Sequence, residues 1–246
     1  MTSPQIISAY AEGEHNANLQ ATLARLEAEG AYKDLSTIII VPTVGKVPTR
    51  VVASWWSMYT PPNQRVAKLF ADGFEIGEAF SRTIESILAN PDLSTYKYIL
   101  TLEHDNLPPP DGIVRLIARM HQNPQFAAIG GLYFTKGPGG VAQIWGDPAD
   151  PVLNFRPQKP DVNGGLVECC GTGMGFTAFR LDMFKDAKLR RPWFKTTSSM
   201  TEGAMTQDLY FWSDARKHGY RCAIDCSVKV GHHDADGKFG PAGMTW

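Results

Sequence analysis

Short runs of apolar residues alternate with amphipathic segments along most of this 246-residue chain. The run at 37–42 is continuous, which is typical of a strand buried on both faces of a parallel sheet. Further strands are expected at 65–70, 96–102, 126–134 and 221–230.

Helices are expected between these strands because apolar residues recur there at a spacing of three and four. The clearest stripe covers 76–89, where Ile76, Phe80 and Ile84 share one face before Asn90 and Pro91 end the helix. Weaker patterns predict helices at 16–29, from residue 48, after Pro110 and at 206–218.

Strands that alternate with helices of this length predict βαβ units. The expected fold class is α/β: a single Rossmann-like domain with a mostly parallel central sheet flanked by helices. We expect a helical N-terminal segment over residues 1–36 and the domain over 37–246. Residues 136–165 are rich in Gly, Pro and Asp and lack a clear period, which is typical of a lid or binding loop.

Composition narrows the class of protein further. The hydrophobic content of 43% and charged content of 20% are those of an ordinary globular protein. A net charge of -1 gives no overall attraction to nucleic acid or to an anionic membrane. No apolar run approaches the roughly 20 residues that span a bilayer, and the first residues do not resemble a signal peptide. We therefore expect a cytoplasmic protein without membrane insertion.

The four cysteines leave two interpretations open. Cys169 and Cys170 are adjacent, and Cys222 and Cys226 are four residues apart, which does not match the usual zinc spacings. Buried free thiols are the favoured interpretation. A zinc site that also uses the nearby histidines at 232 and 233 is the alternative.

The most informative candidate chemistry follows the strand at 96–102. Glu103 and Asp105 are one residue apart, so an extended backbone would place both on the same side. Two carboxylates at the end of a strand suit a hard divalent cation that also holds a diphosphate. For Asp105 the alternative is a carboxylate that caps the turn before Pro108.

Other polar residues follow neighbouring strands. In open α/β sheets the ligand binds beyond the carboxyl ends of the strands. Pro42-Thr43, Asp72-Gly73 and 103–105 all lie at such ends, so three loops should converge on one crevice. The glycines of 171–175 are similar to a dinucleotide-binding pattern, but the spacing is incomplete and no dinucleotide site is predicted.

The order of these motifs resembles that of GT-A fold glycosyltransferases, most closely the family 2-like group, over about residues 37–233. The matching segments are Ile38–Thr43, Phe70–Gly73, Ala79–Arg82, Glu103–Asp105, Cys170–Gly173 with Phe179–Arg180, and Thr206–Leu209 with His218–Tyr220.

The resemblance implies transfer of a sugar from a UDP- or GDP-sugar to an acceptor hydroxyl, with Mn2+ or Mg2+ as cofactor. It assigns the donor to a nucleotide-binding half, 37–135, and the acceptor to 136–246. The implied donor-binding residues are Pro42, Thr43, Asp72, Arg82 and His104.

The resemblance also assigns metal ligands and a catalytic base. The implied ligands are Glu103, Asp105 and His232, with His233 as the alternative histidine. Asp208 is the implied general base, although a first-turn Asp is also favoured by the helix dipole alone.

Candidate acceptor contacts are Trp145 in the long loop and Arg190 and Arg191 in a basic run at 185–195. Trp193 and Phe194 flank this run, and such aromatic rings can stack on a base or a sugar. An anionic acceptor, such as a hydroxylated base in DNA, is one interpretation. The alternative is that the run is a solvated face.

Two departures from the family pattern keep other functions open. Glu103 stands where the family usually has Asp, and Gln207 where it often has Glu. One alternative is a sugar-phosphate nucleotidyltransferase, although its Gly-rich, basic loop is poorly matched by 42–46. The other is a non-catalytic nucleotide-sugar-binding module.

Overall fold

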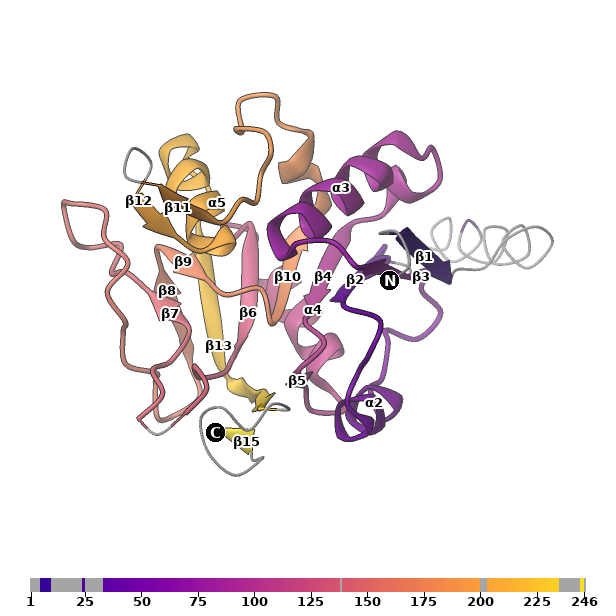
Figure 1. Ribbon diagram of the computed structural model, residues 1–246, viewed down its shortest axis with the longest axis horizontal. Coiled ribbons are helices and arrows are strands. Elements are labelled where there is room, and N and C mark those ends of the chain that lie inside the picture. Colours follow the sequence, from indigo (N-terminus) through magenta and orange to yellow (C-terminus); the bar gives the residue numbers. More distant parts are fainter. Residues whose placement is uncertain are drawn as a thin grey trace.

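Eight strands form the central sheet of the computed structural model, which describes residues 5–9, 24, 33–137, 139–199, 203–234 and 244–245. Across the sheet the strands follow one another in an order that differs from their order in the chain (Figure 1). That order is β1 (Gln5–Ala9), β3 (Val66–Asp72), β2 (Thr37–Thr43), β4 (Tyr98–Leu102), β10 (Phe176–Arg180), β6 (Ala128–Leu132), β13 (Cys222–Lys229) and β8 (Leu166–Cys169).

The sheet is mostly parallel, as predicted. Strands β2, β3, β4, β6 and β13 run in one direction, while β1, β8 and β10 run in the other. Strand β10 lies antiparallel between β4 and β6, so its beginning lies at the edge where those two strands end. This arrangement brings residues from both halves of the chain to one edge.

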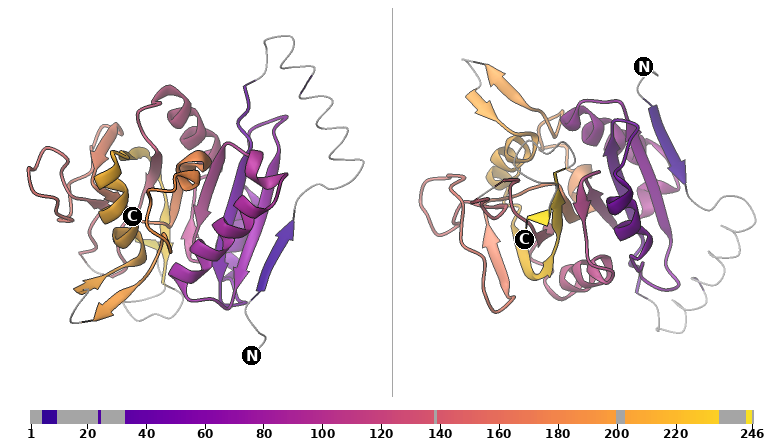
Figure 2. Two further views of the ribbon diagram at one scale, coloured as in Figure 1. Left: turned by 90° about the horizontal axis from the view of Figure 1, so that it is seen from above. Right: turned by 60° about the horizontal axis from the view of Figure 1, so that its bottom comes forward.

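Helices cover both faces of the sheet (Figure 2). Helices α3 (Ile76–Ala89) and α5 (Gln207–Ala215) pack on one face, and α4 (Gly112–Gln122) packs on the other. The remaining helices are short: α2 (Thr49–Trp56) and 3₁₀ turns at Leu93–Thr95, Leu181–Lys185 and Arg216–His218. No helix within the described residues is long and apolar enough to cross a membrane.

Strand β2 shows why a continuous apolar run is needed at the centre of the sheet. Ile38 and Ile40 point into the core beneath α3, whereas Ile39 and Val41 point into the core beneath α4. All four side chains are buried. Because successive residues of a strand face opposite sides, both sides must be apolar when helices cover both.

An aromatic cluster fixes α5 against the sheet. Phe211 and Trp212 of α5 pack against Phe179 of β10, with ring centroids 6.0 Å apart in each pair. Phe211 also stacks on Phe194 at 4.6 Å. Asp208 precedes Phe211 and Trp212 by three and four residues, so the same packing turns Asp208 inward.

The elements expected at 37–134 and 206–230 agree closely with the observed ones, and α3 begins and ends at the predicted residues, whereas β8 and β10 were not expected. The N-terminal segment differs from the expectation of a helical 1–36. Residues Gln5–Ala9 form β1, which extends the sheet by pairing with β3. The helix expected at 16–29 lies outside the described residues except for Ala24, which is helical.

The expected long loop contains short strands. Within it, β7 (Ile144–Trp145) pairs with β9 (Gly171–Thr172), and residues 160–164 form a separate loop near β13. A two-stranded ribbon, β11 (Thr197–Ser199) and β12 (Gly203–Met205), precedes α5.

A small sheet closes the edge where the parallel strands end. Its strands are β5 (Asn106–Leu107), β14 (Gly231–His233) and β15 (Met244–Thr245), with β14 in the middle. His232 lies just after the end of β13. Its pairing with Asn106 therefore brings the end of β13 next to the turn after β4.

All four cysteines are buried and free of disulfides. The Sγ atoms of Cys169 and Cys222 lie 3.9 Å apart on the paired strands β8 and β13. The described residues contain no group of three or more His, Cys, Asp or Glu side chains arranged to hold a metal ion. The thiols therefore contribute to the core.

Candidate active site

Strands β2 and β3 end side by side at the candidate nucleotide site. Thr43 pairs with Asp72, and the amide of Gly73 donates to the carbonyl of Thr43 at 2.9 Å. Gly45 has a φ of +81°, and a Cβ there would lie 3.3 Å from the Asp72 carboxylate. Thr43 and Asp72 thus lie side by side at the edge of the sheet, next to the buried Pro42.

The acidic motif after β4 is a turn and not extended backbone. The amide of Asn106 donates to the carbonyl of Glu103 at 3.1 Å, which closes a turn through His104 and Asp105. The two carboxylates are therefore not presented side by side on a strand, contrary to the expectation from their spacing. Asn106 then starts β5, which holds the end of the turn against β14.

Lys136 and His232 lie beside the Asp105 carboxylate. Lys136 Nζ lies 2.6 Å from Asp105 Oδ2, and His232 Nε2 lies 3.5 Å from the same oxygen. Burial alone raises the pKa of Asp105, but hydrogen bonds and charges from His232 and Lys136 outweigh it and hold this pKa well below its usual range. Asp105 is therefore ionised throughout the physiological range.

The backbone sets the orientation of the His232 ring. His232 Nδ1 lies 2.7 Å from the carbonyl oxygen of Phe134, so Nδ1 must carry the proton of this hydrogen bond. In neutral histidine this leaves the lone pair on Nε2, which faces Asp105. A carbonyl that fixes the ring in this way is the usual support of a metal-binding histidine.

His233 has a different role. Its amide donates to the carbonyl of Asp105 at 2.7 Å, which ties β14 to the acidic turn. Its ring is buried, and Nδ1 has no hydrogen-bond partner among the described residues. Of the two candidate histidines, His232 is the one whose ring reaches the Asp105 carboxylate.

Glu103, Asp208 and Tyr133 form a second group beside Asp105, in which Asp208 and Tyr133 are buried and Glu103 is half-buried. The pKa of Glu103 is raised to about 8, first by burial and then by the charges of Asp105 and Asp208. Burial also raises the pKa of Asp208, against hydrogen bonds from Thr206 and from backbone amides. The pKa of the buried Tyr133 is raised by burial and then by Glu103 and Asp208. These side chains therefore interact electrostatically.

The glycine segment before β10 accommodates Tyr133. The Tyr133 hydroxyl accepts a hydrogen bond from the amide of Gly175 at 2.9 Å. A Cβ at Gly173 would lie 2.1 Å from the hydroxyl oxygen, and a Cβ at Gly175 would lie 2.7 Å from the ring. These glycines permit close packing of a buried tyrosine, which accounts for the pattern without a dinucleotide.

Several predicted residues are engaged in contacts with residues other than the carboxylates at 103, 105 and 208. Arg82 on α3 pairs with Glu78 at 2.6 Å and lines a groove between α3 and residues 192–196. Arg190 stacks on the Tyr210 ring at 3.5 Å and donates to its carbonyl oxygen. Trp145 donates a hydrogen bond to the side chain of Gln143 at 2.8 Å.

The aromatic residues beside the basic run cannot serve as stacking surfaces for an acceptor. Trp193 and Phe194 are each only 1% exposed, because they belong to the aromatic cluster that packs α5 against the sheet. The guanidinium of Arg191 lies 4.6 Å above the Trp193 ring, and Lys185 pairs with Asp182. The basic run therefore contributes to packing through Arg191 and to a local ion pair through Lys185.

The donor atoms present fit one divalent cation only in part. Asp105 Oδ1 is buried without a hydrogen-bond partner among the described residues, and Oδ2 faces His232 Nε2. Two neighbouring ligands of an octahedral ion lie roughly 3 Å apart, close to the observed 3.5 Å. Asp105 and His232 would therefore hold such an ion after a small adjustment, whereas Lys136 now contacts the same oxygen.

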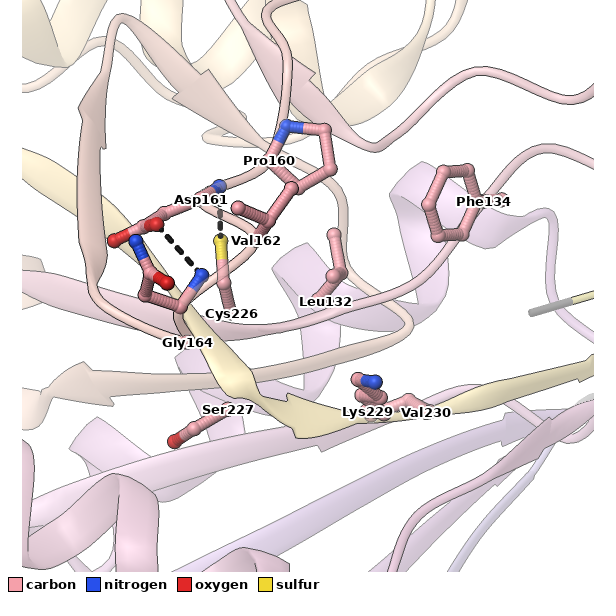
Figure 3. A pocket seen from close by; sticks show the side chains of 11 residues that line it. Leu132, Phe134, Pro160, Asp161, Val162, Gly164, Cys226, Ser227, Lys229 and Val230 are labelled. Atoms are coloured by element: carbon pink, nitrogen blue, oxygen red, sulfur yellow. Dashed lines mark hydrogen bonds between the residues drawn. The ribbon is translucent and has the colours of Figure 1, made fainter.

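A pocket of about 590 Å³ adjoins this site (Figure 3). It lies between the loop at 160–164 and the end of β13, and Phe134 and Val230 form its wall on the side of His232. The amide of Asp161 donates to the Cys226 thiol across this pocket. Phe134 thus contributes its ring to the pocket and its carbonyl to His232.

Sequence reasoning missed Tyr133 and Lys136. Both follow β6, whose end lies at the same edge as the ends of β2, β3 and β4. The rule that ligands bind beyond the carboxyl ends of parallel strands applies to this strand as well. The signal was therefore present, but the loop after residue 134 carries no recognisable motif.

Comparisons with known proteins inform the fold. No protein-family profile matches the chain, and no curated protein sequence matches it. Among solved structures, the crystal structure of A197 from STIV matches with a TM-score of 0.57 over 82% of this chain and 87% of that one. The identity is 18%, so the likeness concerns the fold alone. The fold is α/β, with a mostly parallel central sheet flanked by helices.

The contact between Tyr133 and Gly173 predicts a specific loss of stability. Gly173→Ala should destabilise the protein by about 1–3 kcal/mol, because the new methyl group overlaps the Tyr133 hydroxyl. Tyr133→Phe removes that oxygen, so the double variant should lose less than the sum of the single losses. Urea denaturation of all four proteins measures this coupling; additive losses would contradict the contact.

The raised pKa of Glu103 predicts how stability depends on pH. Between about 4.5 and about 8 the folded protein keeps a proton on Glu103 that the unfolded chain releases, so stability falls as pH rises through this range. Glu103→Gln removes this loss.

Without added metal, Glu103→Gln should therefore raise Tm more at pH 8 than at pH 5.5, by roughly 2–4 °C for each kcal/mol of relieved repulsion. Thermal denaturation at both pH values tests this. Glu85→Gln, at an exposed position of α3, controls for the loss of one negative charge. An equal shift at both pH values would contradict the assignment.

Proposed function

We propose that this chain is a metal-dependent glycosyltransferase that moves a sugar from a nucleotide-diphosphate sugar to an acceptor hydroxyl. One observation carries the proposal: the Asp105–His232 pair, Glu103 and Asp208 occupy the same edge of a GT-A-like sheet. Thr43 and Asp72 lie at that edge as well, because β2 and β3 run parallel to β4. A nucleotide bound beside them would extend its diphosphate toward Asp105.

The donor would be a UDP- or GDP-sugar. In this proposal Pro42 and Thr43 border the base and ribose, Asp72 accepts hydrogen bonds from the base, and His104 borders the diphosphate. Asp105 and His232 would hold Mn2+ or Mg2+, with Glu103 beside them. The bound ion would neutralise charge on the diphosphate leaving group.

Asp208 is the proposed general base. Its raised pKa favours proton acceptance near neutral pH, and Oδ1 is buried without a hydrogen-bond partner among the described residues. Asp208 takes the proton from the acceptor hydroxyl group while the oxygen of that hydroxyl group attacks the anomeric carbon. The bond from that carbon to the diphosphate oxygen breaks, and the nucleoside diphosphate leaves with the electron pair. A single displacement of this kind inverts the anomeric configuration.

The acceptor remains a broader proposal. The pocket beside Phe134 and Val230 has mainly apolar walls with Lys229 at its rim, which suits a ring that carries a hydroxyl group. An anionic acceptor such as a hydroxylated DNA base stays within this proposal. Its phosphates would contact the exposed Arg191, whereas Arg190, Trp145 and Arg82 are engaged in contacts of their own.

A second candidate function is a non-catalytic nucleotide-sugar-binding module. The ion pair between Lys136 and Asp105 favours it, because a lysine on the metal-binding oxygen weakens metal binding. Nucleotide release separates the two functions. A transferase releases UDP or GDP from a panel of nucleotide-sugars with Mn2+, while a binding module retains the intact donor.

The first test of the proposal concerns metal-dependent binding. Asp105→Asn keeps the shape of the side chain but removes its charge, so the gain in UDP or GDP affinity on adding Mn2+ should fall by roughly tenfold or more. Titration calorimetry with and without Mn2+ measures this gain. Asp92→Asn, at an exposed position near the other end of β4, is the matched control. An unchanged gain in Asp105→Asn would refute the metal assignment.

The second test concerns catalysis. Asp208→Asn should keep donor affinity and lower the transfer rate by roughly 10²–10⁴-fold, the usual contribution of a general base. Single-turnover transfer from the donor identified in the panel measures the rate. Asp182→Asn alters an exposed acidic residue in the first turn of another helical segment and controls for helix-end effects. A near-normal rate in Asp208→Asn would reduce Asp208 to a helix-stabilising residue.

A further inference from the structure

We infer that Lys136 is a built-in cation that excludes the divalent ion from Asp105 until the diphosphate of the donor draws the lysine away. The inference rests on the proposed function, because it concerns the order in which metal and donor enter the same site. It gives Lys136 control over when the divalent ion reaches Asp105, a role that no sequence motif indicates.

Lys136 and the divalent ion would compete for the same oxygen of Asp105. Lys136 Nζ contacts Asp105 Oδ2 at 2.6 Å, and His232 Nε2 faces the same Oδ2. An ion shared by Asp105 and His232 must bind at this oxygen. The ammonium already contacts this oxygen, and the side chains of Lys136 and Asp105 are only 24% and 15% exposed. The positive charges of the Lys136 ammonium and of a divalent ion at this oxygen would repel each other strongly, because water is scarce there.

The backbone around Lys136 is held in place, so the exchange falls to its side chain. The amide of Thr135 donates to the carbonyl of Val141 at 2.9 Å, and the amide of Val141 donates to Thr135 Oγ1 at 3.0 Å. A Cβ at Gly140 would lie 2.2 Å from the carbonyl oxygen of Thr135, which shows how tightly this turn is closed. Lys136 therefore projects from a fixed base.

A lysine side chain suits such an exchange of partners. Its ammonium is a compact charge on a flexible four-carbon stem, and it binds a phosphate oxygen as readily as a carboxylate. When the diphosphate lies next to Asp105, rotation of the side chain carries the ammonium from Oδ2 to the phosphates. The carboxylate is then free for the divalent ion, which the diphosphate also binds. Metal and donor binding become mutually dependent.

The test uses the full chain and measures binding of two probes that should respond in opposite directions. Lys136→Met removes the ammonium and should bind Mn2+ alone roughly tenfold tighter than wild type, as followed by the electron paramagnetic resonance signal of free Mn2+. In EDTA the same variant should bind UDP or GDP roughly tenfold weaker, while its affinity for the nucleoside stays unchanged. If Lys136 only stabilised the local structure, its replacement would weaken the binding of both Mn2+ and the nucleotide.

Two further variants serve as controls. Lys136→Arg keeps the positive charge and should resemble wild type in its weak Mn2+ binding. Lys97→Met makes the same change at an exposed position before the opposite end of β4 and should alter neither affinity. Mn2+ binding by Lys136→Met that is no tighter than that of wild type would overturn the inference.

An Asp105→Asn variant separates this outcome from failure of the proposed function. If wild type and Lys136→Met bind Mn2+ equally and Asp105→Asn does not, the metal site stands and only the role of Lys136 is refuted. If Asp105→Asn also binds Mn2+ as wild type does, or none of the proteins binds it, the metal assignment fails together with the inference.

Discussion

The burial of carboxylates at one edge of the sheet is the constraint on which the site depends. A buried carboxylate is costly unless cations or hydrogen-bond donors surround it. Asp105 meets this requirement through Lys136, whereas burial and the neighbouring acids raise the pKa of Glu103 to about 8, so that it stays protonated near neutral pH. Two neighbouring acids are thus held in different protonation states by their surroundings.

Packing far from the acids determines where they lie. The aromatic cluster of Phe179, Phe194, Phe211 and Trp212 fixes α5, and the helical spacing then turns Asp208 toward the edge. The antiparallel β10 carries its glycine segment to the same edge, where Tyr133 packs against it. Large apolar contacts hold α5 and β10 rigidly in place. The acidic side chains could not fix these elements themselves, because their charges repel one another.

The charge arrangement also links stability to function. Glu103 loses its proton only above a pH of about 8 in the metal-free protein, and its negative charge is then unfavourable next to Asp105 and Asp208. A divalent ion would relieve this repulsion, as would the removal of one acid. Lys136 relieves part of it in the absence of any ligand. The lysine therefore stabilises the Asp105 carboxylate, and in the proposed order of binding the same contact would oppose the metal.

The sequence by itself determined the α/β class, the bounds of α3, and the buried strands that end near Thr43, Asp72 and Glu103, because these follow from local spacing and apolar runs. It did not reveal that 103–106 forms a turn, that Trp193 and Phe194 are buried, or that β1 extends the sheet. Only the tertiary structure decided that Lys136 meets Asp105 and that His232, and not His233, faces the Asp105 carboxylate. Lys136 lies 31 positions from Asp105 and His232 lies much farther along the chain, and strand order across the sheet, which local patterns do not encode, brings them together.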